Sequence, residues 1–397
     1  MLAVVAPGQG AQTPGMLAPW VDVPASAALL HRAEAATGLD LVRLGTGGSA
    51  EQIRDTAIAQ PLLVATALAA AAALDLVPQG PGAPLPSSGD RLGATAGHSV
   101  GELAGLVLAG ALGVEQAMQL AVVRGRAMAE ACRAEATGMT AVLGGDPDEV
   151  DTALSRAGLV AANRNAPGQV VAAGPVAGLD ALAADPPSRA RLRRLEVAGA
   201  FHTAAMLPAR AELEAFVSTL PAGSTADARV PVVANADGAV VTSGQELLTR
   251  LVAQVATPVR WDLCTATLAG LGVTALVELP PAGTLAGLAK RALPGVEILA
   301  LRTPDDLDAA LALLHASPPA APEPGMAFRI AVSPGVGAFV PGPVGEGDTV
   351  AAGAALGQVR GRQEQHDVRL AASGVLVEWL AAEGDPVTTG QPLARLA

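Results

Sequence analysis

The chain contains 397 residues, of which 51% are hydrophobic, and its formal net charge is −12 at pH 7. This composition excludes a disordered protein, and the acidic balance argues against binding to nucleic acid or to anionic membranes. Cys132 and Cys264 provide neither a disulfide framework nor the spacing of metal ligands, and we expect no metal and no cofactor. Residues 1–15 do not resemble a signal peptide, so the expected location is the cytoplasm.

The N-terminal third of the chain predicts one strand followed by helices. Residues 2–6 form an apolar run that ends at Pro7-Gly8-Gln9-Gly10, which indicates a buried parallel strand with a ligand-facing loop. The Ala-rich run 62–74 is too short to span a bilayer and predicts a buried helix rather than a membrane segment. Helices are predicted at 25–37, 50–57, 60–77 and 114–132.

The sequence Gly97-His98-Ser99-Val100-Gly101 follows an apolar run and precedes an Ala/Leu-rich segment, which predicts a strand, a sharp turn and a helix. Glycine fits at both ends of such a turn because a Cβ would clash there. The turn presents Ser99 at a helix N-terminus, where developing negative charge is favoured. The motif also occurs in glycine-rich turns with a chance serine, but the strand and helix around it favour a nucleophile.

Residues 134–199 differ from their surroundings in the order of their elements. The order βαββαβ over this segment is typical of a ferredoxin-like subdomain, which can be inserted in a larger domain because its ends lie close together. Strands and helices alternate on both sides of it. We therefore expect an α/β fold with a parallel sheet covered on both faces.

Acyl transfer from a serine requires a base, and histidine is the usual base near neutral pH. His31 adjoins Arg32 on a predicted surface helix, and His98 adjoins Ser99 at a turn where neighbours point in different directions. His315 lies in a predicted linker and His366 in the C-terminal region. His202 lies where the chain re-enters the main sheet. Elimination favours it as the base only slightly over the other histidines.

Several short motifs occur in one order along residues 1–302. This ordered series resembles the malonyl-CoA:acyl carrier protein transacylases and the acyltransferase domains of polyketide synthases. The motifs are Gly8-Gln9-Gly10-Ala11-Gln12, Gln60-Pro61, Gly97-His98-Ser99-Val100-Gly101-Glu102, Arg124-Gly125-Arg126, Asn165-Ala166-Pro167-Gly168-Gln169, Ala200-Phe201-His202, and Gln254 before Pro258-Val259-Arg260-Trp261.

The resemblance implies an α/β acyltransferase domain over 1–302 with a hydrolase-like parallel sheet. It also implies a role for each site residue. Ser99 would be the nucleophile and His202 its base, oriented by Gln254 in place of an acidic residue. The backbone N–H groups of Val100 and Gln9 would form the oxyanion hole. The Arg124 guanidinium would hold the malonyl carboxylate, and Phe201 would exclude a methylmalonyl group; without the resemblance, Arg124 would be taken for a solvated helix arginine.

The expected reaction moves malonyl from malonyl-CoA to the phosphopantetheine thiol of an acyl carrier protein through malonyl-Ser99. The product would feed fatty-acid or polyketide synthesis, and the sequence does not distinguish these. A thioesterase, which admits water to the acyl-serine, is one alternative. A non-catalytic subunit of a carboxylase or decarboxylase complex is another.

Residues 303–326 predict a Pro/Ala-rich linker, and residues 327–397 predict an all-β domain. The repeat E-G-D-x-V-x-x-G, at 346–353 and 383–390, resembles that of the barrel-shaped biotinyl/lipoyl carrier domains. Gln363 stands where those domains carry the modified lysine, and no lysine follows Lys290. We therefore expect an unmodified barrel. Its predicted core is Val340, Val350, Leu356, Val359, Val375, Val377, Leu380, Val387 and Leu393.

A basic run lies near the end of the predicted insertion. Acyl carrier proteins are acidic, as this chain is, so their association requires a local positive surface. The run is equally consistent with an ordinary solvated face. Its members are Arg189, Arg191, Arg193 and Arg194.

Overall fold

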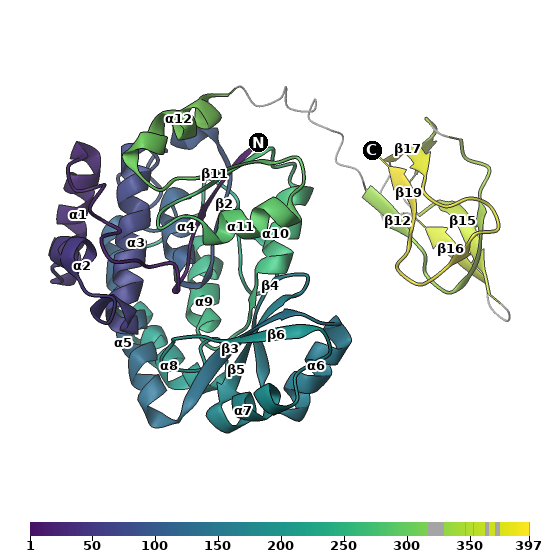
Figure 1. Cartoon of the computed structure of the whole chain (residues 1–397). Coiled ribbons are helices and arrows are strands. Elements are labelled where there is room, and N and C mark those ends of the chain that lie inside the picture. Colours follow the sequence, from purple (N-terminus) through teal and green to yellow (C-terminus); the bar gives the residue numbers. More distant parts are fainter. Residues whose placement is uncertain (317–328, 346, 352, 362–364, 370–373, 397) are drawn as a thin grey trace. The chain divides into compact units, whose positions relative to one another are not determined.

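The computed structural model describes residues 1–316, 329–345, 347–351, 353–361, 365–369 and 374–396 (Figure 1). The chain divides into two compact units, Met1–Ala316 and Ser317–Ala397. Gln363 lies outside the described residues.

The first unit is built on a six-stranded sheet with the order β11-β10-β1-β2-β7-β8. All neighbours in it are parallel except β8, which is antiparallel to β7. Leu2, Val4 and Ala6 of β1 face one hydrophobic core, and Ala3 and Val5 face another. The sheet is therefore covered on both faces, as predicted. Its strands are β1 (Leu2–Ala6), β2 (Leu92–Gly97), β7 (Val232–Val233), β8 (Val240–Val241), β10 (Ala275–Glu278) and β11 (Glu297–Ala300).

Helices from the first half of the chain pack on one of these faces. Helix α3 (Thr56–Ala73) is long and apolar enough to cross a membrane, yet most of it is buried inside the protein, which confirms a core helix. The prediction of a helix over 50–57 was wrong, because Asp55 accepts a hydrogen bond from the Ala57 N–H and starts α3 there. The other elements are α1 (Pro24–Thr37), α2 (Leu41–Gly47), η1 (Gln52–Arg54), η2 (Gly89–Arg91), η3 (Ser99–Gly101), α4 (Glu102–Leu108) and α5 (Val114–Ala134).

The segment after α5 forms a second sheet with the order β6-β3-β5-β4-β9 (Figure 1). Strand β9 (Val259–Arg260) comes from a later part of the chain and pairs in parallel with β4, so it joins this sheet to the first unit's main body. Helix α6 begins at Pro147 because the Asp146 carboxylate accepts two N–H groups of its first turn. The elements are β3 (Thr137–Gly144), α6 (Pro147–Arg156), β4 (Val160–Ala166), β5 (Gln169–Pro175), α7 (Val176–Ala184) and β6 (Ala190–Arg194).

The remaining helices complete the two layers of the first unit. The expected linker, 303–326, begins too early, because Ala310 and Leu314 of α12 are buried in the main core. Two further helices, α2 and α11, were not predicted. The elements after β6 are η4 (Ala204–Met206), α8 (Leu207–Ser218), α9 (Gly244–Gln254), α10 (Trp261–Gly270), α11 (Thr284–Ala292), η5 (Pro304–Asp306) and α12 (Leu307–His315).

The second unit consists of two four-stranded sheets, with the orders β12-β19-β17-β14 and β16-β15-β13-β18. The repeat produces matching turns, since the N–H groups of Gly347 and Gly384 donate to Leu376 and Phe339 of the opposite strands at 2.7 and 2.8 Å. The strands are β12 (Arg329–Val332), β13 (Gly337–Pro341), β14 (Thr349–Val350), β15 (Ala355–Arg360), β16 (Gln365–Arg369), β17 (Gly374–Trp379), β18 (Pro386–Val387) and β19 (Pro392–Leu396).

The core of this unit agrees with the prediction except at Val340, Val375, Val377 and Leu380. Val350, Leu356, Val359, Val387 and Leu393 are buried, as predicted. In β17 the buried residue is Leu376, so Val375 and Val377 lie on the other face, and Leu380 is 40% exposed. Val340 is only partly buried. Where several neighbouring residues in a strand are apolar, the sequence does not define which alternate positions face inward. The pairing with neighbouring strands decides it.

Candidate active site

Ser99 lies in a tight turn between β2 and α4. A Cβ on Gly97 would lie 2.0 Å from the Gly101 carbonyl carbon, and a Cβ on Gly101 would lie 2.3 Å from the Ala6 oxygen. Both positions therefore require glycine. Ser99 itself has φ of +52°, a left-handed conformation that costs energy for a residue with a side chain. The sequence therefore places this serine in a strained turn at the carboxyl end of a central strand.

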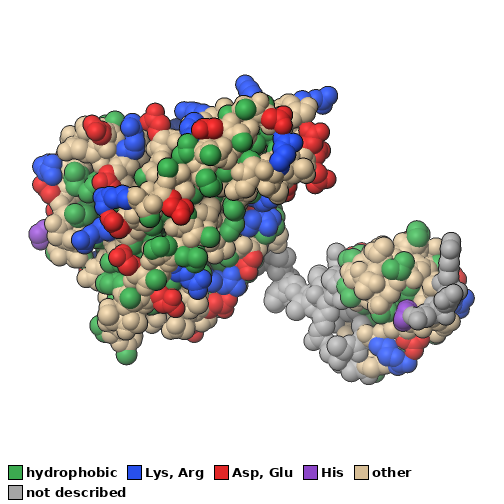
Figure 2. All heavy atoms as spheres, turned by 90° about the horizontal axis from the view of Figure 1, so that it is seen from below, with side chains coloured by type: hydrophobic (Ala, Val, Ile, Leu, Met, Phe, Trp, Pro, Cys, Tyr) green, Lys and Arg blue, Asp and Glu red, His purple; other side chains and the backbone are tan. Residues whose placement is uncertain are grey.

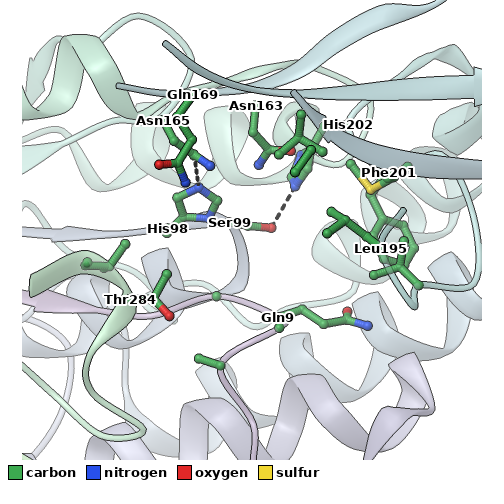
Figure 3. Close-up of a pocket in the computed structure, with 18 of the residues that line it drawn as sticks. Gln9, His98, Ser99, Asn163, Asn165, Gln169, Leu195, Phe201, His202 and Thr284 are labelled. Atoms are coloured by element: carbon green, nitrogen blue, oxygen red, sulfur yellow. Dashed lines mark hydrogen bonds between the residues drawn. The ribbon is translucent and has the colours of Figure 1, made fainter. Parts of the chain in front are cut away.

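His202 is the histidine that contacts Ser99 (Figure 3). Its Nε2 lies 2.8 Å from Ser99 Oγ, and its Nδ1 lies 2.8 Å from the backbone carbonyl of Gln254. A carbonyl can only accept, so Nδ1 carries the proton and Nε2 presents a lone pair to the serine hydroxyl. Burial, followed by the positive charge of Arg124, lowers the pKa of His202 to about 3. The neutral imidazole is thus the form that faces Ser99.

Arg124 is buried beneath Ser99 on α5. Its guanidinium donates to Ser99 Oγ at 3.1 Å, to Gln60 Oε1 at 2.7 Å and to Gln254 Oε1 at 2.9 Å. Gly125 allows α5 to pack closely against α3, because a Cβ there would lie 2.7 Å from the Thr56 carbonyl oxygen of α3. Burial lowers the pKa of Arg124 to about 10, which leaves the guanidinium charged at neutral pH. The group is a buried cation that contacts Ser99 Oγ, and its Nε has no hydrogen-bond partner among the described residues.

A cavity of about 240 Å³ opens beside the Ser99 hydroxyl. Gln9, His98, Ser99, Phe201 and His202 line it, together with side chains of the second sheet and of α11 (Figure 3). Its wall is largely apolar, including Met128, Met139, Val171, Leu195, Val197 and Leu288. The cavity thus combines a reactive polar end with apolar walls.

Among the predicted residues, Ser99, His202, Arg124 and Gln254 are joined by hydrogen bonds, and Gln9 and Phe201 line the cavity with Ser99 and His202. Gln254 contacts His202 in a different way from the one predicted. Gln254 holds His202 through its backbone carbonyl, whereas its side chain contacts Arg124, Glu102 and the Ser99 carbonyl. The amide side chain therefore does not replace the acidic residue of a triad. A backbone contact of this kind leaves no signal in the sequence.

Several residues of the site were not predicted. His98 does not contact the Ser99 hydroxyl in the described structure; its Nε2 lies 2.9 Å from Asn165 Oδ1, and its ring packs 5.6 Å from that of Trp261. Thr284, Leu285 and Leu288 come from the unpredicted helix α11. Among the described residues, no group of three or more His, Cys, Asp or Glu side chains is arranged to hold a metal ion.

Comparison with known proteins identifies the family. The acyl transferase domain family matches residues 4–297. A malonyl CoA-acyl carrier protein transacylase of Mycobacterium tuberculosis is 50% identical over 317 residues, which cover 78% of this chain and 98% of that protein. This chain belongs to the malonyl-CoA:acyl carrier protein transacylase family.

Solved structures of other transacylases share the fold of this one. The crystal structure from Mycobacterium tuberculosis matches with a TM-score of 0.72 at 49% identity, over 79% of this chain and 99% of that one. A malonyl-transacylase bound to a type II polyketide-synthase acyl carrier protein matches with a TM-score of 0.69 at 31% identity, again over 79% and 99%. The family match ends at residue 297, so it does not reach the second unit of this transacylase.

Proposed function

We propose that this enzyme transfers malonyl from malonyl-CoA to the phosphopantetheine thiol of an acyl carrier protein. The observation that supports this most directly is the buried Ser99–His202 pair, 2.8 Å apart, with a buried arginine on the same hydroxyl. An acyl-serine mechanism uses the pair, and a carboxylate on the acyl group uses the arginine. The name of the Mycobacterium tuberculosis relative, malonyl CoA-acyl carrier protein transacylase, agrees with this reaction.

In the first half-reaction Ser99 Oγ attacks the thioester carbonyl while His202 Nε2 takes its proton. The tetrahedral intermediate then collapses, the C–S bond breaks, and the proton passes from His202 to the departing CoA thiolate. In the second half-reaction the carrier thiol gives its proton to His202 and attacks malonyl-Ser99. Breakage of the ester C–O bond then returns that proton to Ser99.

The negative charge that forms on the carbonyl oxygen needs hydrogen-bond donors. The N–H groups of Val100, in η3, and of Gln9 are the proposed donors. Gly8 supports this assignment, because a Cβ there would lie 2.5 Å from the His98 carbonyl oxygen, so only glycine lets the first loop approach the turn this closely. Each such donor typically accelerates acyl transfer by about 10²–10³-fold.

Labelling with radioactive malonyl-CoA tests the proposed function. A stable label on Ser99 that moves to added carrier protein supports the transacylase. Rapid release of malonate without transfer would instead identify a thioesterase, and absence of label would favour a non-catalytic subunit.

Phe201, 5% exposed in the cavity wall, is the proposed barrier to methylmalonyl.

Arg124→Ala is expected to change the substrate that the enzyme prefers. Loss of the charge-assisted contact to the malonyl carboxylate should lower kcat/KM for malonyl-CoA by about 10–10²-fold, and the activity on acetyl-CoA relative to malonyl-CoA should rise. Arg126→Ala is the matched control, because Arg126 is exposed on the same helix. An unchanged ratio of malonyl to acetyl activity in Arg124→Ala would contradict the assignment.

Docking of the carrier protein is assigned to one face of β6. Arg193 pairs with Ala141 and Arg191 with Leu143, and Ala141 lines the cavity. Leu192, between them, packs with the α6 and α7 core on the opposite face. Because side chains alternate along a strand, Arg191 and Arg193 share the face that lines the cavity.

Arg194 and Arg156 lie on the side of α6 and α7. Arg194 pairs with Asp180 of α7, and Arg156 pairs with Asp185. The face seen in Figure 2 intersperses positive with negative side chains. A carrier protein with an acidic surface would therefore be attracted locally, by the two arginines near the cavity, rather than by the chain as a whole.

Reversing both cavity-side charges, Arg191→Glu with Arg193→Glu, is expected to raise KM for the carrier protein roughly tenfold. Formation of malonyl-Ser99 from malonyl-CoA should change far less, and added salt should reduce the difference between variant and wild type. Arg156→Glu with Arg194→Glu makes the same change in net charge on the other face. Equal effects of the two double variants would rule out a localised docking surface.

Finer assignments of the two smaller folds follow from their strand orders. The order β6-β3-β5-β4, with α6 and α7 on one face, supports a ferredoxin-like subdomain over 134–199. The paired sheets and matching turns of the second unit support a biotinyl/lipoyl-like barrel over 327–397. Residues 317–326 of the predicted linker lie outside the described residues. Biotin and lipoate are joined to a lysine amine, which no residue after Lys290 provides.

Deletion of residues 317–397 is expected to leave malonyl transfer to a free carrier protein within about threefold of the full-length rate, since the first unit has its own core. Expression with biotin and lipoyl ligases should leave the mass of the full-length chain unchanged. A mass increase on the second unit, or loss of transfer in a folded truncation, would show that this unit takes part in the chemistry.

A further inference from the structure

Asn235 is a buried polar residue that the proposed chemistry does not use. It lies two residues beyond β7, which neighbours β2 in the main sheet, and it is 1% exposed. Its side chain crosses the turn that carries the nucleophile, because Oδ1 accepts from the Ser99 N–H at 2.7 Å and Nδ2 donates to the Gly97 carbonyl at 2.7 Å. These two partners determine the orientation of the amide. In the flipped orientation the Asn235 NH₂ group would face the Ser99 N–H, and its oxygen would face the Gly97 carbonyl.

The backbone of Asn235 is held as firmly as its side chain. Its N–H donates to Glu102 Oε1 at 2.6 Å, and its carbonyl accepts from the Arg260 N–H at 2.7 Å. Every polar group of the residue therefore has a partner. Such a residue has little freedom to move, so it can fix the position of whatever its side chain holds.

The turn at Ser99 needs such support. Its φ of +52° persists only where the surroundings hold it, and the buried Ser99 N–H and Gly97 carbonyl would otherwise lack the partners that Asn235 supplies. A shift of this turn would move Oγ away from His202 Nε2, now 2.8 Å distant.

Glu102 contacts both Asn235 and Gln254, the residue whose backbone carbonyl holds His202. Its second carboxylate oxygen accepts from Gln254 Nε2, which also donates to the Ser99 carbonyl at 3.1 Å. The backbone carbonyl of the same Gln254 holds His202 Nδ1 at 2.8 Å. One set of buried contacts thus reaches both members of the reacting pair.

We propose that Asn235 is a positioning residue that holds the Ser99 turn in its reactive conformation, and that Glu102 fixes Asn235 and Gln254 in place. This inference rests on the proposed role of Ser99 as nucleophile. Neither side chain lines the substrate cavity, so both act through their neighbours and not on the substrate.

Asn235→Ala in the full-length chain tests this proposal. We expect kcat to fall about 10²-fold, the usual cost of misplacing a reacting group by about 1 Å, while KM for malonyl-CoA changes less than about threefold. Reaction of Ser99 with a fluorophosphonate should slow in parallel, because that probe reports on the hydroxyl without requiring malonyl. Asn235→Asp retains the acceptor for Ser99 but not the donor for Gly97, and it should also lower kcat.

Cys264→Ala is the matched control, because its Sγ lies 3.9 Å from Asn235 Nδ2 but does not contact the turn. It should keep its fluorophosphonate rate. Glu102→Gln, which places an amide donor against another donor, provides a second route if Asn235→Ala does not fold. The proposal is overturned if a folded Asn235 or Glu102 variant keeps kcat and probe reactivity within about threefold of wild type. If the wild type reacts with the probe but never accepts malonyl, the proposed function fails and the positioning role stands.

Discussion

Ser99→Ala is expected to abolish covalent labelling by malonyl-CoA and to lower kcat by about 10⁴-fold or more. The acyl-enzyme route requires an oxygen at this position, and alanine removes it while retaining the backbone of the turn. The neighbouring contacts, from the Ser99 N–H to Asn235 and from Gln254 to the Ser99 carbonyl, do not involve the lost hydroxyl. We therefore expect the variant to fold.

Intact-mass spectrometry after brief exposure to malonyl-CoA measures this directly, with peptide mapping to locate the label. Ser26→Ala is the matched control, since Ser26 is also a buried serine but donates to the Ala69 carbonyl in a helical layer. The control should label as fully as the wild type. Normal turnover by Ser99→Ala would eliminate the acyl-serine mechanism.

His202→Ala is expected to lower the rates of both half-reactions by about 10³-fold or more, because in the proposed mechanism the same imidazole takes the proton in each. Single-turnover malonylation and transfer to carrier protein can be measured separately. His31→Ala replaces an exposed histidine on α1 and should behave as the wild type. A His202 variant that slows only one half-reaction would show that a different group serves as base in the other.

The lowered pKa of His202 adds a pH dependence to this prediction. At a pKa of about 3 the imidazole stays neutral, so kcat/KM should show no acid limb from His202 near its ordinary value of 6.5.

The same shift affects stability. Between pH 3 and pH 6.5 the unfolded chain binds a proton on this histidine and the folded chain does not. The histidine's contribution to stability is therefore complete above pH 6.5 and is lost as the pH falls toward 3. In His202→Ala the decline in unfolding free energy over this range should be smaller.

The sequence was most informative where function depends on local geometry. Gly97 and Gly101 predict the turn around Ser99, because crowding at these two positions admits no Cβ, and the structure has that crowding. The buried helix α3 followed from its apolar composition, and the two-faced sheet followed from strands alternating with helices. Each of these inferences uses neighbours that are close in the chain.

Predictions failed where the outcome depends on partners that are distant in the chain. The inward-facing position of β17 is set by packing against neighbouring strands. Helix α2 is different, because it was missed although the nearby Asp40 side chain caps its start. Arg191 and Arg194 lie on opposite faces because side chains alternate along β6, and the register of β6 against β3 decides which of them is on the cavity side. A one-residue shift in that register would exchange the two.

The sequence alone, through its ordered motifs, was enough to indicate the family and to name Ser99, His202, Arg124 and Gln254 as site residues. Only the tertiary structure decided how they act. It shows that the Gln254 backbone, not its amide, holds His202, and it brings Asn235 to Ser99 across 136 positions of sequence. The physical reason is that a carbonyl is present at every residue and a buried hydrogen bond depends on distance and direction, so the chain has to fold before these partners are defined.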